Sequence, residues 1–104
     1  MRIDIDQTLQ EMIQAVEESL GDGWKKVSGP VKEMMHRQRE RFEMLSQMRT
    51  EGLLTEEEFQ YRLNEQKQIL QANVEALKLR GKVLAQNAAN AAIEVFEKAV
   101  RALL

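Results

Sequence analysis

The sequence predicts an all-α fold, either a long antiparallel helical hairpin or a three-helix, coiled-coil-like bundle, completed by self-association. Two observations carry this prediction. The composition is rich in strong helix formers and holds only 1 proline, and apolar residues recur at helical spacing through most of the chain. The 104 residues suit a single domain. Turn and cap residues divide the chain into helices at about 5–20, 30–50 and 56–102.

The first helix is expected to run from about Ile5 to Leu20. Asp4 precedes it as an N-cap residue, and Gln7 follows three positions later. The glycines of "LGDGW" end the helix. Its buried face is a narrow stripe at about 100° per residue, formed by Ile5, Leu9, Met12, Ile13, Val16 and Leu20.

The second helix is expected over about residues 30–50, with Pro30 in its first turn, where the missing N–H costs nothing. Its apolar face holds Val31, Met35, Phe42 and Leu45. Residues 22–29 are compatible with a short helix, a kink or a loop. Trp24 within them is expected to anchor the core.

The segment "RTEGLLTEEEFQYRL" predicts a tight corner between the second and third helices. Gly52 suits the left-handed position after a helix end. Thr55 and Glu58 form a capping box, and Leu54 with Phe59 forms a hydrophobic staple. The glutamates of the first turn also complement the helix dipole. These structural roles leave little reason to assign the three carboxylates to catalysis or to a metal.

The third helix is expected over about residues 56–102, because no firm stop precedes its end. Leucines recur every seven residues, as in a coiled coil, and an unbroken helix of this length would measure about 70 Å. Folding the chain at Leu53 lays the first two helices along the third. Gly81 permits either a close helix crossing or a break, and the break gives the competing bundle. The apolar stripe is Phe59, Leu63, Leu70, Val74, Leu77, Leu84, Ala88, Ala91 and Val95.

A two-layer hairpin buries little core, so a second contact face is expected on the third helix. The alternative is a scatter of exposed apolar residues, which is common. The alanine-rich segment "AQNAANAA" would allow another helix to approach closely. A homo-oligomer, most simply a twofold dimer, follows. The expected interaction stripe comprises Leu63, Leu70, Leu77, Leu84, Leu79, Val83, Ile93 and Val100.

Catalytic and metal-binding residues are sparse. There is no cysteine, and the single histidine, His36, follows Glu33 at the spacing of carboxylate-bundle metal sites. A full site would need a partner carboxylate such as Glu11 or Glu65, and Glu33 and His36 are both expected to face solvent. No nucleophile motif or phosphate-binding loop is present. We therefore expect no enzymatic activity and no cofactor.

The charge pattern argues against nucleic-acid binding, because the net charge is −2 and a cationic excess is lacking. No apolar run reaches the roughly 20 residues that a membrane span needs, so membrane binding is not expected. The N-terminus lacks a signal-peptide core, which favours the cytoplasm. We expect Met34, Met35, Met44 and Met48 to fill the core or to occupy ordinary surface positions, with an adaptable binding groove as the alternative.

Residues 43–70, "EMLSQMRTEGLLTEEEFQYRLNEQKQIL", resemble the SHOCT-type short helical hairpin of bacterial proteins. The similarity lies in the corner, where Gly52, Leu53, Leu54 and Thr55 precede "EEEF". The resemblance covers about a quarter of the chain. It implies a bacterial origin and an assembly role without catalysis.

These features together predict a non-enzymatic helical oligomerisation, adaptor or scaffold protein. It would act by burying apolar stripes against another copy or against another helical protein. One alternative is a ferritin-like metal-binding protein that uses Glu33 and His36 in an oligomer. The other is an amphipathic binder of lipid or polymer surfaces, which the alanine-rich segment suggests.

Overall fold

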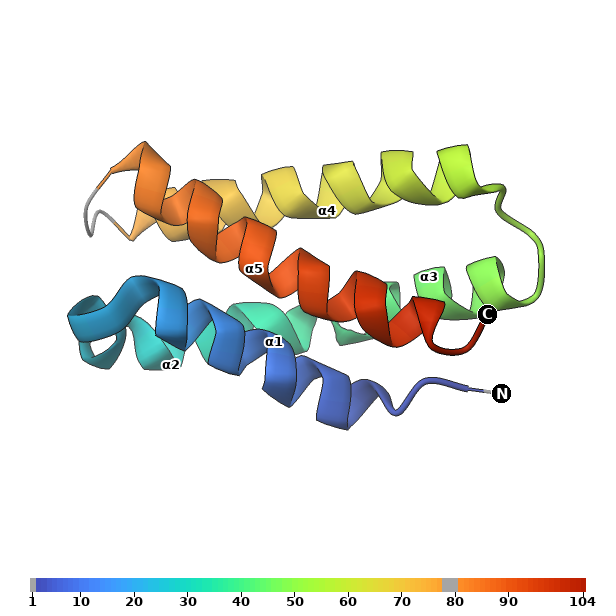
Figure 1. Ribbon diagram of the computed structural model, residues 1–104. Helices are drawn as coiled ribbons and strands as arrows, with labels where there is room; N and C mark the ends of the chain where they lie inside the picture. The colour runs from blue at the N-terminus through green and yellow to red at the C-terminus, as the bar shows by residue number, and fades with distance from the viewer. Residues whose placement is uncertain (1, 78–80) are drawn as a thin grey trace.

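The computed structural model describes residues 2–77 and 81–104, which form an all-α bundle without strands in these ranges (Figure 1). The all-α prediction is confirmed. The helices pack as rods: α1, the nearly continuous pair α2 and α3, α4, and α5. Every helix among the described residues is too short or too polar to span a lipid bilayer. The bounds are α1 Ile5–Leu20, the 3₁₀ turn η1 Gly21–Gly23, α2 Trp24–Arg37, α3 Arg39–Thr50, α4 Glu56–Ala76 and α5 Lys82–Arg101.

The prediction of one long helix over 56–102 is wrong, and so is the long hairpin built on it. α4 ends at Ala76 and α5 begins at Lys82, so the chain reverses and α5 packs back on α4. Gly81 has φ 85° and ψ −174°, a conformation that favours glycine. The molecule's longest extent is 39 Å, whereas the unbroken helix would need about 70 Å. Gly81 therefore acts as a break, which is the competing model.

Pro30 lies inside α2 and not in the first turn of a helix that starts at residue 30. The chain turns through η1 and becomes helical again at Trp24. Proline leaves the carbonyl of Lys26 without its helical partner, but both residues are exposed, so water can bond this oxygen. Gly29 lacks the Cβ that would clash with the proline ring in a helix. The Gly-Pro pair is therefore compatible with a helix here.

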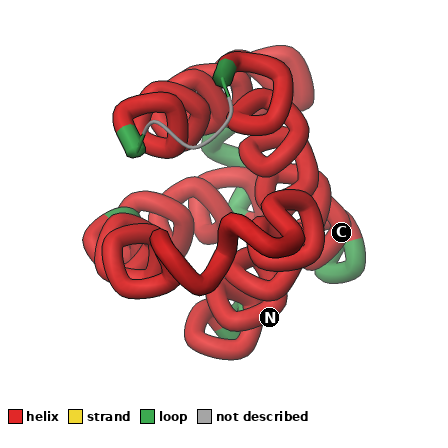
Figure 2. Tube along the Cα trace, turned by 90° about the vertical axis from the view of Figure 1, so that its left-hand side faces the viewer, coloured by secondary structure: helices red, strands yellow, loops and turns green. Residues whose placement is uncertain are grey.

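The bundle has one closely packed side and one looser side. Seen end-on in Figure 2, α4 and α5 form the upper pair and α1 and α2 the lower pair. α5 packs extensively against α1 and α4, whereas α3 and α4 touch only slightly. The small side chains on α5 explain the close packing against α1, since Ala85, Ala88, Ala89 and Ala92 are all buried. The alanine-rich segment thus brings helices together within one chain.

The core face of α5 differs from the face expected by extending the α4 register. The expected stripe held Ala88, Ala91 and Val95. Ala88 is buried as expected, but Ala91 and Val95 are only half-buried, whereas Phe96 and Val100 have no exposed surface. The shift amounts to about one residue, or about 100° around the helix. The break before α5 explains it, because a helical phase cannot be carried across a non-helical residue.

Candidate binding groove between α3 and α4

The corner between α3 and α4 holds these two helices in an antiparallel hairpin. Gly52 takes φ 79°, and the N–H of Leu53 donates to the carbonyl of Met48 at 2.8 Å, which closes the end of α3. The Glu58 N–H donates to Thr55 Oγ1 at 3.1 Å, and the Thr55 N–H donates to Glu58 Oε1 at 3.0 Å. The corner cap residues Gly52, Thr55 and Glu58 therefore fix where each helix stops or starts.

Arginines tie the corner to the end of α5. Arg101 donates to Glu56 and, at 2.7 Å, to Glu97 Oε2. Arg49 Nη2 lies 3.2 Å from Glu56 Oε2. Hydrogen bonds from Arg101, and also from Gln60, lower the pKa of Glu56 and of Glu97 below the ordinary glutamate range. This network fixes the first turn of α4 against the last turns of α3 and α5.

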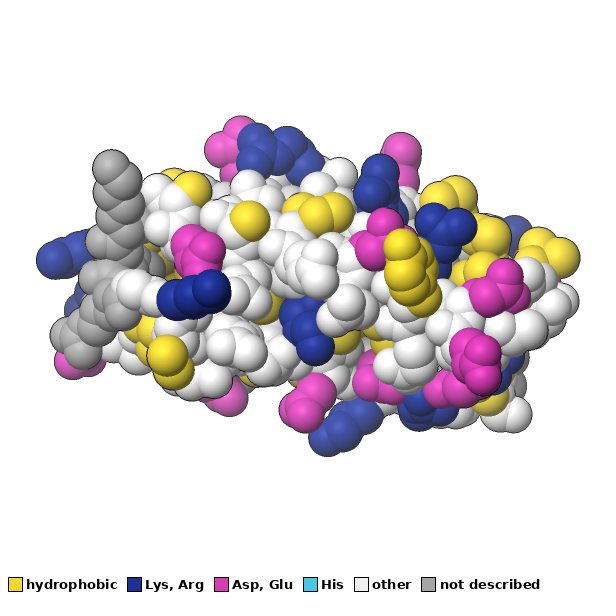
Figure 3. Space-filling view, turned by 90° about the horizontal axis from the view of Figure 1, so that it is seen from above, with side chains coloured by type: hydrophobic (Ala, Val, Ile, Leu, Met, Phe, Trp, Pro, Cys, Tyr) yellow, Lys and Arg dark blue, Asp and Glu magenta, His cyan; other side chains and the backbone are white. Residues whose placement is uncertain are grey.

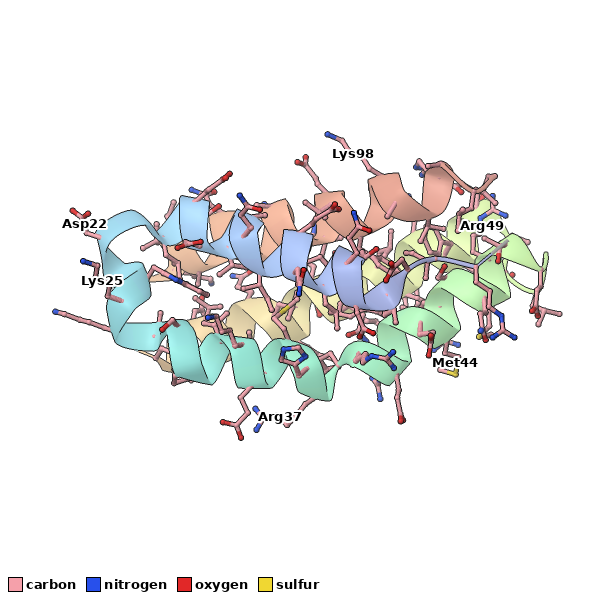
Figure 4. All side chains as sticks on the ribbon, turned by 90° about the horizontal axis from the view of Figure 1, so that it is seen from below. Asp22, Lys25, Arg37, Met44, Arg49 and Lys98 are labelled. Atoms are coloured by element: carbon pink, nitrogen blue, oxygen red, sulfur yellow. The ribbon has the colours of Figure 1, made fainter. Side chains whose placement is uncertain are left out.

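A groove of about 360 Å³ runs between α3 and α4, where the two helices separate. Each helix contributes residues at the spacing i, i+3, i+4 and i+7, which is one helical face. Leu45 is buried, Met48 and Ile69 are half-buried, and Met44 is 53% exposed. Figure 4 shows Met44 pointing outward from α3. The lining residues are Arg41, Met44, Leu45 and Met48 from α3, and Arg62, Glu65, Gln66 and Ile69 from α4.

Gln66 is the polar residue most deeply placed along this groove. Its side chain is 3% exposed, and its Oε1 has no hydrogen-bond partner. It occupies the buried face of α4 between Leu63 and Leu70. A buried amide oxygen without a donor costs about 1–3 kcal/mol. Gln66 therefore lowers the stability of the free protein, and it does so at the most buried polar residue of the groove.

The rim of the groove carries an excess of positive charge. Arg62 Nη1 lies 3.8 Å from Glu65 Oε1, so these two exposed residues partly neutralise each other. Arg41 forms no ion pair with any residue that the structure describes. A ligand with a carboxylate near Arg41 would therefore complement the rim.

The predicted interaction stripe mostly lies inside the chain's own core. Leu63, Leu70, Ile93 and Val100 are buried, and Val83 is 70% exposed. The half-buried Leu77 and Leu84 pack against the core, and Leu79 lies outside the described residues. In one chain these buried side chains are already covered, so no partner is required to cover them.

Glu33 and His36 are both exposed on α2. Glu33 Oε1 lies 3.7 Å from Arg37 Nη1, so its carboxylate already faces a cation on its own helix. Within the described ranges, no three histidine or acidic side chains are grouped so that they could hold a metal ion. The geometry therefore gives the Glu-x-x-His pair no further ligands in one chain.

A second, polar groove of about 330 Å³ lies between α4 and α5. At one end, Gln60 Nε2 donates to Glu97 Oε2 at 2.6 Å. Because these two side chains already bond each other, they need no hydrogen bond from a ligand. The α3–α4 groove, by contrast, contains the unpaired Gln66 Oε1. It is lined by Gln60, Leu63, Asn64, Lys67, Asn90, Ile93, Glu94 and Glu97.

Sequence reasoning considered a methionine groove but did not find its α4 wall. Met44 and Met48 lie in the groove, whereas Met34 and Met35 fill the core. Arg41, Gln66 and Ile69 were not singled out. One signal was available, since Gln66 is polar at a position where the leucine spacing of α4 requires burial.

Comparison of the chain with known proteins matches no family model, no curated protein and no solved structure.

Proposed function

We propose that the protein is a non-enzymatic helical adaptor that binds an amphipathic helix of a partner protein in the α3–α4 groove. The observation that carries the proposal is the pair of matching helical faces which α3 and α4 leave open to each other. Helix-in-groove recognition uses anchors at this same spacing. Met44 and Met48 supply unbranched, polarizable walls that adapt to differently shaped anchors.

The distribution of exposed apolar residues supports this face. Of the five large apolar side chains that are exposed among the described residues, Met44, Leu53 and Tyr61, at 53%, 65% and 67%, belong to α3, α4 or the corner between them. Met44 lines the groove itself. Figure 3 views the molecule from above; charges of both signs are interleaved, and apolar side chains gather toward the corner end. The resemblance of residues 43–70 to the SHOCT-type hairpin also supports an assembly role. A cytoplasmic location and the lack of catalysis stay predictions.

Homo-oligomerisation also stays a prediction, but the structure weakens the argument on which it rests. The sequence predicts it from uncovered apolar stripes, but four of the eight stripe residues are buried in one chain's core and two more, Leu77 and Leu84, pack against that core. Light scattering at high micromolar concentration distinguishes the two uses of the surface. A monomer with an available groove fits the adaptor, while a dimer that Met44→Asp dissociates would assign the groove to a second copy.

Selection from a displayed library of helical peptides tests the proposal directly. The library is built on a 14-residue amphipathic helix with variable apolar anchors. Peptides enriched on the wild-type protein should lose binding to the Met44→Asp variant. Val83→Asp is the matched control, because Val83 lies on α5 and is at least as accessible, at 70% exposure against 53% for Met44. No enrichment, or equal loss with both variants, would contradict a docking role for the groove.

A further inference from the structure

The chemistry of the groove restricts which helix it can accept, and this inference rests on the proposed function. The apolar lining residues Leu45, Met48 and Ile69 offer no strong hydrogen-bond donor to Gln66. Arg41 and Arg62 also line the groove, but neither donates a hydrogen bond to Gln66. The Oε1 of Gln66 therefore stays unpaired. Oε1 itself has almost no exposed surface, so the missing donor must come from an occupant or a water toward which the amide turns.

We propose that the groove selects a partner helix in which one hydrogen-bonding residue interrupts the apolar anchors and binds Gln66, while an acidic flank binds Arg41. An asparagine or glutamine is the best match for the amide of Gln66, because it offers both a donor and an acceptor. The terminal torsion of Gln66 is soft, so its amide can turn toward such a group. A polar residue at one buried position of packed helices is known to fix register and partner choice.

The positive rim decides between another protein's helix and a second copy. The charged lining residues are two arginines and one glutamate, so the lining has a net charge of +1 and twofold docking would place two positively charged faces against each other. Like charges placed across an interface are unfavourable. An acidic helix from another protein meets no such repulsion.

The size of the groove leads to the same choice. The lining residues of α3 span from Arg41 to Met48, which is about 10 Å, or two helical turns. A stable dimer of folded proteins usually needs roughly 20–30 residues from each side. Eight lining residues match the contact face of one short helix.

The first experiment needs no ligand and measures thermal stability. Gln66→Leu should raise Tm by about 4 °C or more, because it removes an unpaired buried polar group. Gln68→Leu, at an exposed position on the same helix, is the matched control and should change Tm little. A fall in Tm with Gln66→Leu would show that the amide has a structural partner in the free protein, and would overturn the proposal.

The second experiment compares peptide selections on three variants of the whole chain. The library is the amphipathic 14-residue helix described above, with one central anchor and one flanking position randomised. Wild type should enrich asparagine or glutamine at the anchor and aspartate or glutamate at the flank. Gln66→Leu should enrich aliphatic anchors, and Arg41→Glu should enrich lysine or arginine flanks. Peptides selected on wild type should bind Gln66→Leu about tenfold more weakly.

The outcomes separate this inference from the proposed function. Peptides that lose binding with Met44→Asp but show the same anchor and flank residues on all three variants would overturn the inference alone. A lack of groove-dependent peptides would overturn both. Lys98→Glu, a charge reversal on α5, controls for net charge and should leave the selected flank unchanged.

Discussion

The rings of Phe42 and Phe96 lie with their centroids 4.8 Å apart and tilted by 55°, which joins α3 to α5 through the centre of the bundle. Both side chains are 0% exposed. A tilted aromatic pair of this kind adds about 0.5–1.5 kcal/mol beyond its buried area. The contact also fixes the rotation of α5 about its axis, because it requires Phe96 on the inner face.

Phe96→Ala should therefore lower the free energy of unfolding by about 3–5 kcal/mol, as expected for a large core cavity. Val95→Ala should cost less, since Val95 is only half-buried. Urea unfolding of the two variants measures the difference. A larger loss for Val95→Ala would mean that α5 keeps the phase of an unbroken helix.

Gly81→Ala should destabilise the protein by about 1–3 kcal/mol. The cost is conformational, because the space around a Cβ at this position is open while φ is 85°. Lys82→Ala, at the neighbouring exposed position, controls for changes at the start of α5. Thermal unfolding compares them, and equal stability of the Gly81→Ala variant would contradict a glycine-dependent break.

Removing Arg101 should make stability less dependent on acid pH. Hydrogen bonds from Arg101 lower the pKa of Glu56 and of Glu97 in the folded state. The unfolded chain then binds more protons near the ordinary glutamate pKa of about 4.3, so this stabilisation is present above that pH and is lost as pH falls through the folded pKa values. The Tm difference between wild type and Arg101→Ala should shrink from pH 7 to pH 3.

Lys98→Ala is the matched control for that titration. Lys98 is a second basic residue in the last turn of α5, and Figure 4 shows it pointing away from the bundle. Its loss should change Tm little at any pH. An Arg101→Ala difference that stays constant down to pH 3 would indicate a packing role for the guanidinium in place of the carboxylate pairing.

Thr55→Ala should lower stability by about 1 kcal/mol, because the Glu58 N–H loses its acceptor at the start of α4. Glu58→Gln should cost less, since glutamine can also complete a capping box. Chemical denaturation of both variants tests the order. The reverse order would mean that the charge of Glu58, and not the cap of Thr55, stabilises the corner.

The sequence determined the features that depend on near neighbours in the chain. The span of α1 and its cap by Asp4 follow from local periodicity and side-chain chemistry. The α3–α4 corner follows from the same kind of signal, because Gly52, Thr55 and Glu58 act within a few residues of one another. The angle of Glu33 and His36 to Val31 around the helix likewise predicted that both side chains face solvent, and both are exposed.

Tertiary structure decided the reversal at Gly81, the phase of α5 and the opening of the groove. A glycine on an apolar stripe is compatible with a crossing or a break, and the choice depends on whether α5 gains more by packing on α1 and α4 than by extending. The groove depends on the separation of α3 and α4, which long-range packing sets. Local patterning specifies which face of a helix is apolar, whereas only the assembled bundle determines which apolar faces are covered.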